Sequence, residues 1–142
     1  MSIEFARKMS LAYNLSCKSL CQELKLPQTA FDILMFLANN PNYKTASDIV
    51  EIRKIKANLV SVNVDRLVQE GYLQRQAVEG DRRKTELLCT SKAQPIIEKG
   101  RDLQQDFMER LLFNMDDNKK NELKEIIHIM EQNLDTILKG DK

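Results

Sequence analysis

The densest group of cationic side chains in the sequence follows a turn signal, Glu79-Gly80-Asp81. Arg82, Arg83 and Lys84 stand together there, directly after Gly80 and Asp81. Guanidinium and ammonium groups bind phosphate oxygens, and arginine also binds base edges through parallel N–H groups. Because Gly-Asp is typical of a tight turn, we expect a charged hairpin loop over residues 77–84. The predicted chemistry is contact with a nucleic-acid duplex, and the alternative is a merely solvated turn.

The charge distribution supports the same chemistry. Residues 52–84 contain eight bases and four acids, a net charge of +4, although the whole chain carries only +1. From residue 92 to the end, nine bases meet eleven acids, a net charge of −2. One positive region on a nearly neutral chain is typical of a DNA-binding module.

Other chemistry has little support in the sequence. His128 is the only histidine, so no metal site is expected. No Gly-rich phosphate loop, nucleophile with a histidine base or close carboxylate pair is present, so neither an enzyme nor a cofactor is expected. Cys17 and Cys21 lie one helical turn apart, where a mutual disulfide fits poorly. They are either small core residues or thiols that sense oxidants.

The elements around the cationic loop follow from periodicity. We expect a helix over residues 56–71 and strands over 72–76 and 85–89. Val60, Val64 and Leu67 should pack inward, leaving the opposite side polar. Lys56 offers no capping acceptor, and capping by Asn58 would start the helix two residues later.

The flanking segments predict further helices, which makes the fold mainly α. Helices are expected over residues 3–24, 27–39, 46–53, 91–113 and 117–139, the third opened by a capping box at Thr45 and Asp48. Two short helices joined by a tight turn before a hairpin predict a winged helix-turn-helix with a two-stranded β wing. We expect an N-terminal dimerisation helix (1–26), a DNA-binding domain (27–90) and C-terminal dimerisation helices (91–142).

The apolar stripes of the long terminal helices predict a homodimer. A compact winged unit has little surface on which to bury both stripes, and a second copy of the chain supplies it. Twofold symmetry would also place two copies of the 56–71 helix in successive major grooves. The alternative is an intramolecular bundle.

Length and composition are those of a single soluble domain. The chain has 142 residues, of which 30% are charged and 42% apolar. No apolar run approaches the roughly 20 residues that span a bilayer, and the N-terminus lacks a signal-peptide core. We therefore expect a cytoplasmic protein with no membrane association, whose three cysteines are free thiols.

The chain resembles the MarR (multiple antibiotic resistance regulator) family of winged helix-turn-helix regulators. The family pattern is Leu-x-x-x-Gly-Leu/Tyr-hydrophobic-x-Arg, then Asp-x-Arg, then Leu-Thr-x-x-Gly. The matching segments are Leu67 to Arg75, Asp81-Arg82-Arg83 and Leu87 to Ala93. The departures are Lys56 in place of a capping residue, Asn63 at an apolar position, Cys89 in place of Leu and Ala93 in place of Gly.

The resemblance implies residue roles. Arg83 would approach the minor groove, Asp81 would orient it through an ion pair, and Arg82 and Lys84 would contact phosphates. Some family members sense oxidants through a thiol on the first helix, which would apply to Cys17 or Cys21. Family members also bind small aromatic effectors near the first, second and fifth helices; the corresponding residues are Met9, Tyr13, Phe31 and Met35, for which plain core packing is the alternative.

The sequence thus predicts a dimeric regulator that binds double-stranded DNA at a pseudo-palindromic operator. It would repress neighbouring genes until a small-molecule effector or an oxidant releases it. The alternative is a dimeric interaction or adaptor protein of the same fold that has lost DNA binding. The residues expected to contact DNA are Arg53, Lys54, Lys56, Asn58, Ser61, Val62, Arg66, Asp81, Arg82, Arg83 and Lys84.

Overall fold

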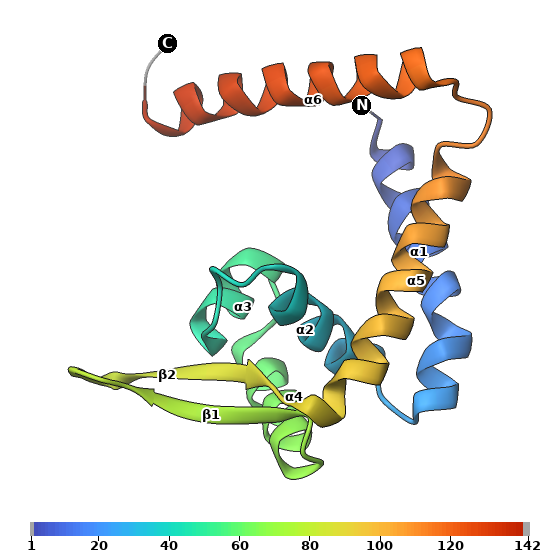
Figure 1. Cartoon of the computed structure of the whole chain (residues 1–142). Coiled ribbons are helices and arrows are strands. Elements are labelled where there is room, and N and C mark those ends of the chain that lie inside the picture. Colours follow the sequence, from blue (N-terminus) through green and yellow to red (C-terminus); the bar gives the residue numbers. More distant parts are fainter. Residues whose placement is uncertain (1, 141–142) are drawn as a thin grey trace. The chain divides into compact units, whose positions relative to one another are not determined.

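The computed structural model describes residues 2–140 and is mainly helical, with one two-stranded sheet (Figure 1). The elements in chain order are α1 (Ile3–Leu24), α2 (Gln28–Asn39), α3 (Ala46–Arg53), α4 (Ala57–Gln69), β1 (Leu73–Val78), β2 (Asp81–Cys89), η1 (Ser91–Ala93), α5 (Gln94–Leu111) and α6 (Asp117–Leu138). This confirms the predicted winged helix-turn-helix with long terminal helices. The chain divides into two compact units, one ending at Phe107 and the other beginning at Met108.

The core of the first unit is built around α2. Seven of the twelve residues of this helix are buried, including Phe31, Ile33 and Leu34. Helices α3 and α4 pack against each other and α4 also packs against α2, each with one apolar side turned inward. Burial of these side chains is the main stabilising term for the unit.

Helix α5 approaches α2 closely at a glycine. A Cβ atom on Gly100 would lie only 2.8 Å from Cε of Met35 and 3.1 Å from Cε1 of Phe31. Both neighbours are buried in the core, so a larger residue at this position would overpack it. The absence of a side chain therefore lets Met35 and Phe31 pack directly against α5.

Three helices begin with side-chain caps, whereas α2 and α4 do not. Ser2 accepts a hydrogen bond from the Phe5 amide, and Thr45 and Asp48 form the predicted capping box. Asp116 caps α6. Helix α4 begins at Ala57 without any side-chain cap from Lys56, close to the predicted start at residue 56. The alternative of a later start capped by Asn58 is wrong.

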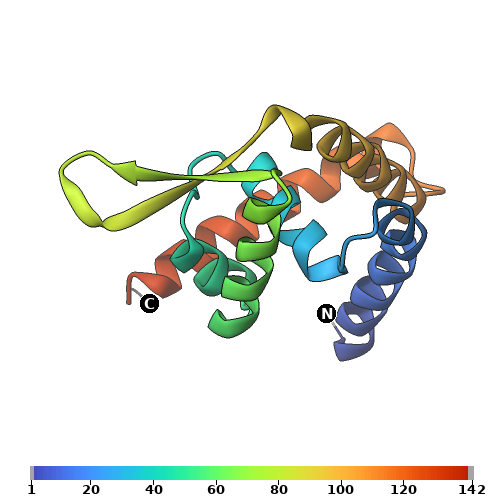
Figure 2. The same cartoon turned by 90° about the horizontal axis from the view of Figure 1, so that it is seen from below.

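The wing is longer than predicted, and its cations lie in a strand. The expected loop over 77–84 consists largely of strand residues, because β1 reaches Val78 and β2 starts at Asp81. Only Glu79 and Gly80 form the tip, where Gly80 adopts a positive φ of 82°. The hairpin extends away from α3 and α4 (Figure 2).

The pairing register explains how three residues fit into one strand. Ala77 pairs with Thr85, whereas the next residue, Val78, pairs with Asp81. Arg82, Arg83 and Lys84 are therefore extra residues of β2 without partners on β1. Such a bulge bends a strand and redirects its side chains. We call these three residues the basic bulge.

The second unit contains α6, whose apolar stripe is uncovered. No residue of this helix is buried, and six side chains of the predicted stripe are exposed, namely Ile126, Ile127, Met130, Leu134, Ile137 and Leu138. Isolated exposed apolar residues need no explanation, but a continuous stripe marks an interaction surface. Within residues 2–140, no helix combines the length and hydropathy that crossing a bilayer requires.

Candidate nucleic-acid interface

Helix α4 has one buried side and one polar, exposed side, as predicted. Val60, Val64 and Leu67 are buried in the core. On the opposite side, Asn58 and Ser61 are exposed, and no described residue forms a hydrogen bond with either side chain. Val62 lies beside them with 65% of its surface accessible. This side of α4 can therefore donate and accept hydrogen bonds and make an apolar contact with a partner molecule. It need not first break a hydrogen bond within the protein.

Asn63 does not disturb this arrangement. It is only 8% exposed, and its Nδ2 donates to the Leu59 carbonyl at 2.8 Å. A buried amide that bonds within its own helix avoids the cost of an unsatisfied polar group. The departure from the family's apolar residue thus leaves the orientation of α4 intact.

Three arginines near α4 join elements of the protein to one another. Arg53 pairs with Asp32 of α2 at 3.6 Å, and Arg75 of β1 pairs with Asp65 of α4. Arg66 donates from Nη2 to the Lys25 carbonyl at 2.9 Å and from Nε to Glu70 at 3.1 Å. Of the predicted DNA contacts, Arg53 and Arg66 are thus occupied by protein partners.

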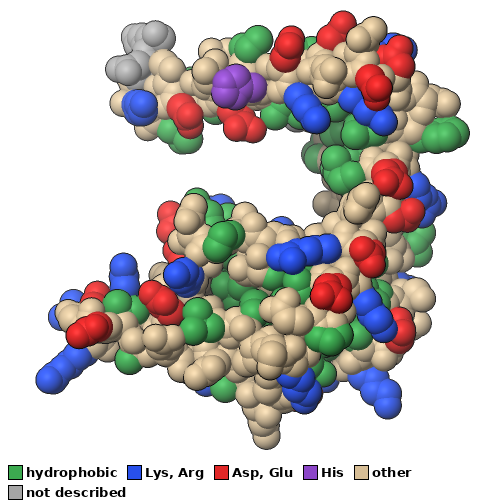
Figure 3. All heavy atoms as spheres, viewed as in Figure 1, with side chains coloured by type: hydrophobic (Ala, Val, Ile, Leu, Met, Phe, Trp, Pro, Cys, Tyr) green, Lys and Arg blue, Asp and Glu red, His purple; other side chains and the backbone are tan. Residues whose placement is uncertain are grey.

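The remaining predicted cations form no ion pair. Among the described residues, no carboxylate oxygen lies within 4.0 Å of Lys54, Lys56, Arg82, Arg83 or Lys84. These five residues flank the start of α4 or belong to the basic bulge. Figure 3 shows Lys and Arg side chains projecting from the end of the hairpin. The five cations are therefore available to bind a polyanion.

Lys84 also acts at longer range on Asp48, in the first turn of α3. Desolvation raises the pKa of Asp48, but hydrogen bonds from Thr45 and Lys44 and the charge of Lys84 outweigh it and leave the pKa below its usual value. The Leu87 amide donates to the Lys44 carbonyl at 2.7 Å, joining β2 to the segment that precedes α3. The wing is thereby anchored to the segment that precedes α3.

Asp81 contacts Arg83 through the backbone and not through the expected ion pair. Its Oδ1 accepts a hydrogen bond from the Arg83 amide at 3.0 Å. A carboxylate that bonds an amide two residues ahead forms an Asx-type turn and fixes the backbone there. Asp81 therefore shapes the basic bulge and leaves the Arg83 guanidinium free.

The C-terminal end of α4 is held by Thr90 and Lys92, whose contacts were not predicted from the sequence. The Thr90 hydroxyl donates to the Gly71 carbonyl at 2.6 Å. Lys92 Nζ donates to the Glu70 carbonyl at 2.6 Å and lies 4.8 Å from the centre of the Tyr72 ring. Two features of the sequence could have predicted these contacts. Thr90 is the threonine of the family's Leu-Thr pattern, and Lys92 is a cation close enough to α4 to bind the carbonyl groups at its C-terminus.

The two candidate redox thiols are protected by the core. Cys17 is fully buried and Cys21 is 8% exposed. Burial raises the pKa of Cys17 above its usual value and raises the pKa of Cys21 to about 11. Since the thiolate is the reactive form, the structure favours the core-residue interpretation for both.

The residues expected near an effector divide between core and half-exposed positions. Phe31 and Met35 are buried, whereas Met9 and Tyr13 are partly exposed. Gln104 donates to the Tyr13 hydroxyl at 3.0 Å, and the Tyr13 ring meets Phe107 edge-on at 5.4 Å. Burial raises the pKa of Tyr13 to about 12. The described residues contain no group of three potential metal ligands.

These elements define the chain as a winged helix-turn-helix protein. Its residues 24–84, from the end of α1 to the basic bulge, match the sequence model of the MarR family. The resemblance to this family is thereby confirmed. The matched segment includes α4 and the three cations of the basic bulge. No curated protein sequence matches the chain significantly.

Solved structures share the fold over nearly the whole chain. A Listeria monocytogenes protein assigned to the MarR family transcriptional regulators, in complex with 26mer DNA, superposes with a TM-score of 0.79 at 17% identity and covers 100% of this chain and 97% of its own. A MarR transcriptional regulator of Methanosarcina mazei gives 0.72 at 22% identity, covering 94% and 99%. The reduced form of MarR from E. coli gives 0.69 at 17% identity, covering 92% and 96%.

Proposed function

We propose that this protein is a homodimeric transcription regulator that binds a pseudo-palindromic DNA operator and represses neighbouring genes by occluding their promoter. The basic bulge carries the proposal. Three adjacent cations without strand partners or ion pairs project from the same unit that exposes the polar side of α4. A duplex fits this pair of features, since a helix enters a major groove while a hairpin tip reaches phosphates or the adjacent minor groove.

The two features have different tasks in this proposal. Asn58, Ser61 and Val62 face the base edges, where an amide, a hydroxyl and a methyl group each have partners. Arg83 approaches the minor groove, and Arg82 and Lys84 bind phosphates on either side of it. Arg53 holds α3 against α2, and Arg66 holds α4 against the end of α1. Both are left out of the direct DNA contacts.

The uncapped start of α4 fits the same role. The first amides of a helix have no intrahelical acceptor, and the positive end of the helix dipole favours an anion there. Lys54 and Lys56 flank this end without ion pairs. A DNA phosphate would supply the acceptor that the sequence omits.

The dimer is supported by the uncovered apolar side chains of α6. Its stripe is exposed in the single chain, and a second copy is the partner that is always present at equal concentration. An isologous pairing gives two wings and two copies of α4 related by a twofold axis. That symmetry matches half-sites about one helical turn apart.

The solved relative from Listeria monocytogenes gives independent support, because that protein of the same fold was captured with 26mer DNA.

Release by a small-molecule effector completes the proposed regulatory cycle. An effector acts only if it binds one spacing of the two α4 helices better than the other.

The test is a gel shift with DNA taken upstream of the chain's own gene. The wild type should give a salt-sensitive complex, and Arg83→Ala should weaken it by about 1–3 kcal/mol, the range for one good contact. Lys8→Ala, which removes an exposed α1 cation outside this surface, serves as the control. Equal binding by wild type and Arg83→Ala would contradict the wing assignment. A folded dimer that binds none of the upstream DNA would favour the adaptor alternative.

A further inference from the structure

The exposed side of α4 carries an apolar strip beside its polar groups. Val62 is 65% exposed, and Leu59, three residues earlier on the same helix, is 45% exposed. Val60 lies between them in the sequence and is buried, so the strip is separate from the core. Leu59 was not among the residues expected to contact DNA. In a major groove, the apolar partner for such a strip is the C5-methyl group of thymine.

The neighbouring amide favours adenine. Asn58 is exposed, and no described residue forms a hydrogen bond with its side chain. An asparagine amide can accept a hydrogen bond from adenine N6 while it donates one to N7, and this pair of bonds is specific for that base. A serine hydroxyl, as at Ser61, pairs with more than one base and sets little preference.

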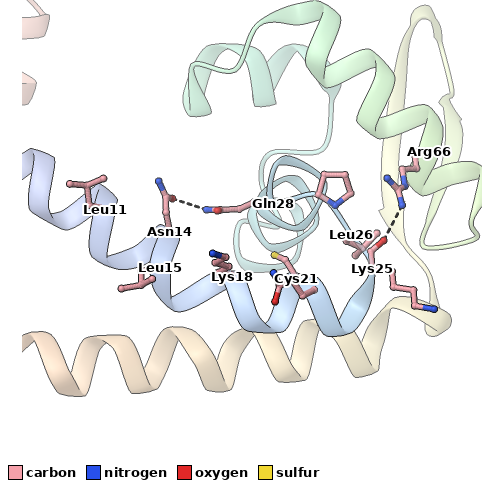
Figure 4. Close-up of a pocket in the computed structure, with 11 residues that line it drawn as sticks. Leu11, Asn14, Leu15, Lys18, Cys21, Lys25, Leu26, Gln28 and Arg66 are labelled. Carbon is pink, nitrogen blue, oxygen red and sulfur yellow. Dashed lines mark hydrogen bonds between the residues drawn. The ribbon is translucent and has the colours of Figure 1, made fainter.

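The side chain of α4 that would read guanine is engaged inside the protein. Guanine is read chiefly by an arginine or lysine that donates to O6 and N7. Arg66 is the only cation of α4. Figure 4 shows its guanidinium directed at the end of α1, where Nη2 donates to the Lys25 carbonyl at 2.9 Å. Its Nε donates to Glu70 at 3.1 Å, so α4 offers no free cation to a guanine.

The side chain of α4 that would read cytosine is engaged as well. Aspartate and glutamate accept a hydrogen bond from cytosine N4. Asp65 is the only acid of α4, and its Oδ1 accepts a hydrogen bond from Nη2 of Arg75 in β1. Lys54 and Lys56 precede α4 beside its uncapped amides, where a phosphate is the expected partner. The groups of α4 that favour a G·C pair are thus bound by the protein, whereas those that favour an A·T pair are free.

We propose that α4 reads A·T pairs in the major groove, with the Asn58 amide on N6 and N7 of an adenine and with Val62 and Leu59 against the C5-methyl groups of thymines. This inference rests on the proposed function, because it assigns base identities to the operator. Asn58 and Val62 are four residues apart and therefore lie one above the other on the same side of the helix. They reach neighbouring base pairs, and twofold symmetry repeats these pairs in the second half-site.

The base preference is measured by selecting duplexes from a random-sequence library with the full-length protein. The wild type should select two symmetric half-sites. Asn58→Ala should relax the preference for adenine at one position of each half-site, and Val62→Ala the preference for thymine at a neighbouring position. Lys8→Ala, which removes an exposed cation of α1, should select the same sequence as the wild type. Circular dichroism checks that each variant is folded.

A second measurement removes the read groups from the DNA and leaves the protein unchanged. In one half-site of the selected duplex, uracil in place of thymine removes only the methyl group, and 7-deazaadenine in place of adenine removes only N7 as an acceptor. Both changes lie in the major groove and keep base pairing.

Fluorescence anisotropy compares these duplexes. Uracil should weaken wild-type binding about fourfold, as expected for one apolar methyl group, and 7-deazaadenine about fivefold, as expected for half of a bidentate contact. Val62→Ala should be indifferent to uracil at the thymine whose selection it loses, and Asn58→Ala indifferent to 7-deazaadenine. A variant that merely misfolds would lose affinity for every duplex alike.

Three results would overturn the inference. They are selection of G·C pairs at the positions that respond to Asn58→Ala and Val62→Ala, unchanged selection by both variants, and equal wild-type affinity for thymine and uracil duplexes. Each of them leaves the proposed function standing, because the wild type would still bind an operator. If the folded wild type selects no duplex at all, the proposed function fails and the inference fails with it.

Discussion

Arg75 of β1 and Asp65 of α4 form an ion pair that joins the wing to the polar side of the neighbouring helix. The two side chains are 45% and 62% exposed, so the pair is screened by solvent. Exposed pairs of this kind contribute about 0–1 kcal/mol to folding. The main role of this contact is to fix the direction of the hairpin relative to α4. The hairpin and α4 can contact one duplex together only if that direction is kept.

This role predicts a small stability effect with a larger effect on binding. In a double-mutant cycle, Asp65→Ala and Arg75→Ala should show a coupling of about 0.2–1 kcal/mol in urea unfolding. Each single variant should weaken DNA binding, although less than Arg83→Ala does. A variant that loses the ion pair and binds DNA as tightly as the wild type would show that the hairpin direction is set elsewhere.

The uncapped start of α4 predicts opposite changes in stability and DNA affinity. Lys56→Ser supplies a capping hydroxyl and should raise the free energy of unfolding by about 0.5–1 kcal/mol, measured in urea. The same substitution removes a cation and satisfies amides that would otherwise bind phosphate, so DNA affinity should fall. Lys56→Gln, which removes only the charge, is the control for the affinity change. If Lys56→Ser were both more stable and tighter on DNA, the amides would have no part in phosphate binding.

The uncovered stripe of α6 predicts that the dimer depends on it. Met130→Glu with Leu134→Glu should give a monomer in size-exclusion chromatography with light scattering, because two charges would have to be buried at the interface. Gln132→Glu adds charge on the opposite side of the same helix and should leave the dimer intact. A monomeric wild type, or a double variant that remains dimeric, would exclude α6 as the interface.

The raised pKa values of buried groups predict a loss of stability in alkali. Burial raises the pKa of Cys21 to about 11 and that of Tyr13 to about 12. Each group loses its proton at a lower pH in the unfolded chain than in the folded chain. Its contribution to the free energy of unfolding is therefore complete below the unfolded pKa and is lost as pH rises through the folded pKa. Melting temperatures should therefore fall between about pH 9 and pH 12, and Cys21→Ala should flatten the lower part of that fall.

The same burial predicts indifference to mild oxidants. At neutral pH, hydrogen peroxide should leave DNA binding unchanged, and iodoacetamide should modify Cys17 and Cys21 only after denaturation. Mass spectrometry of the alkylated protein checks this. Rapid modification of either thiol in the folded protein would restore the oxidant-sensing interpretation.

The sequence predicted the helices and the inward side of α4 because apolar spacing alone determines them. Val60, Val64 and Leu67 recur at helical intervals, and the Thr45–Asp48 capping box marks the start of α3 unambiguously. The start of α4 was less certain because Lys56 lacks a capping group. Tertiary packing of the same apolar residues overrides that local weakness and starts the helix at Ala57.

The position of the wing could be predicted from the sequence, but its strand pairing could not. Gly80 identified the turn, whereas the three-residue register shift depends on backbone pairing that no local pattern encodes. For the same reason, Asp81 was assigned an ion pair where it bonds an amide. The partners of Arg53, Arg66 and Arg75 also lie on separate elements, so sequence could count these cations but could not say which remain free.

The central claim is that the basic bulge binds DNA phosphates on both halves of a dimeric complex. Its most direct test is the salt dependence of operator binding, measured by fluorescence anisotropy for the wild type and for Arg82→Gln with Arg83→Gln and Lys84→Gln. Each phosphate contact contributes about 0.9 to the slope of log K against log salt concentration. We predict a slope that is shallower by about two or more in the triple variant and unchanged in Lys8→Gln. An unchanged slope in the triple variant would contradict the account.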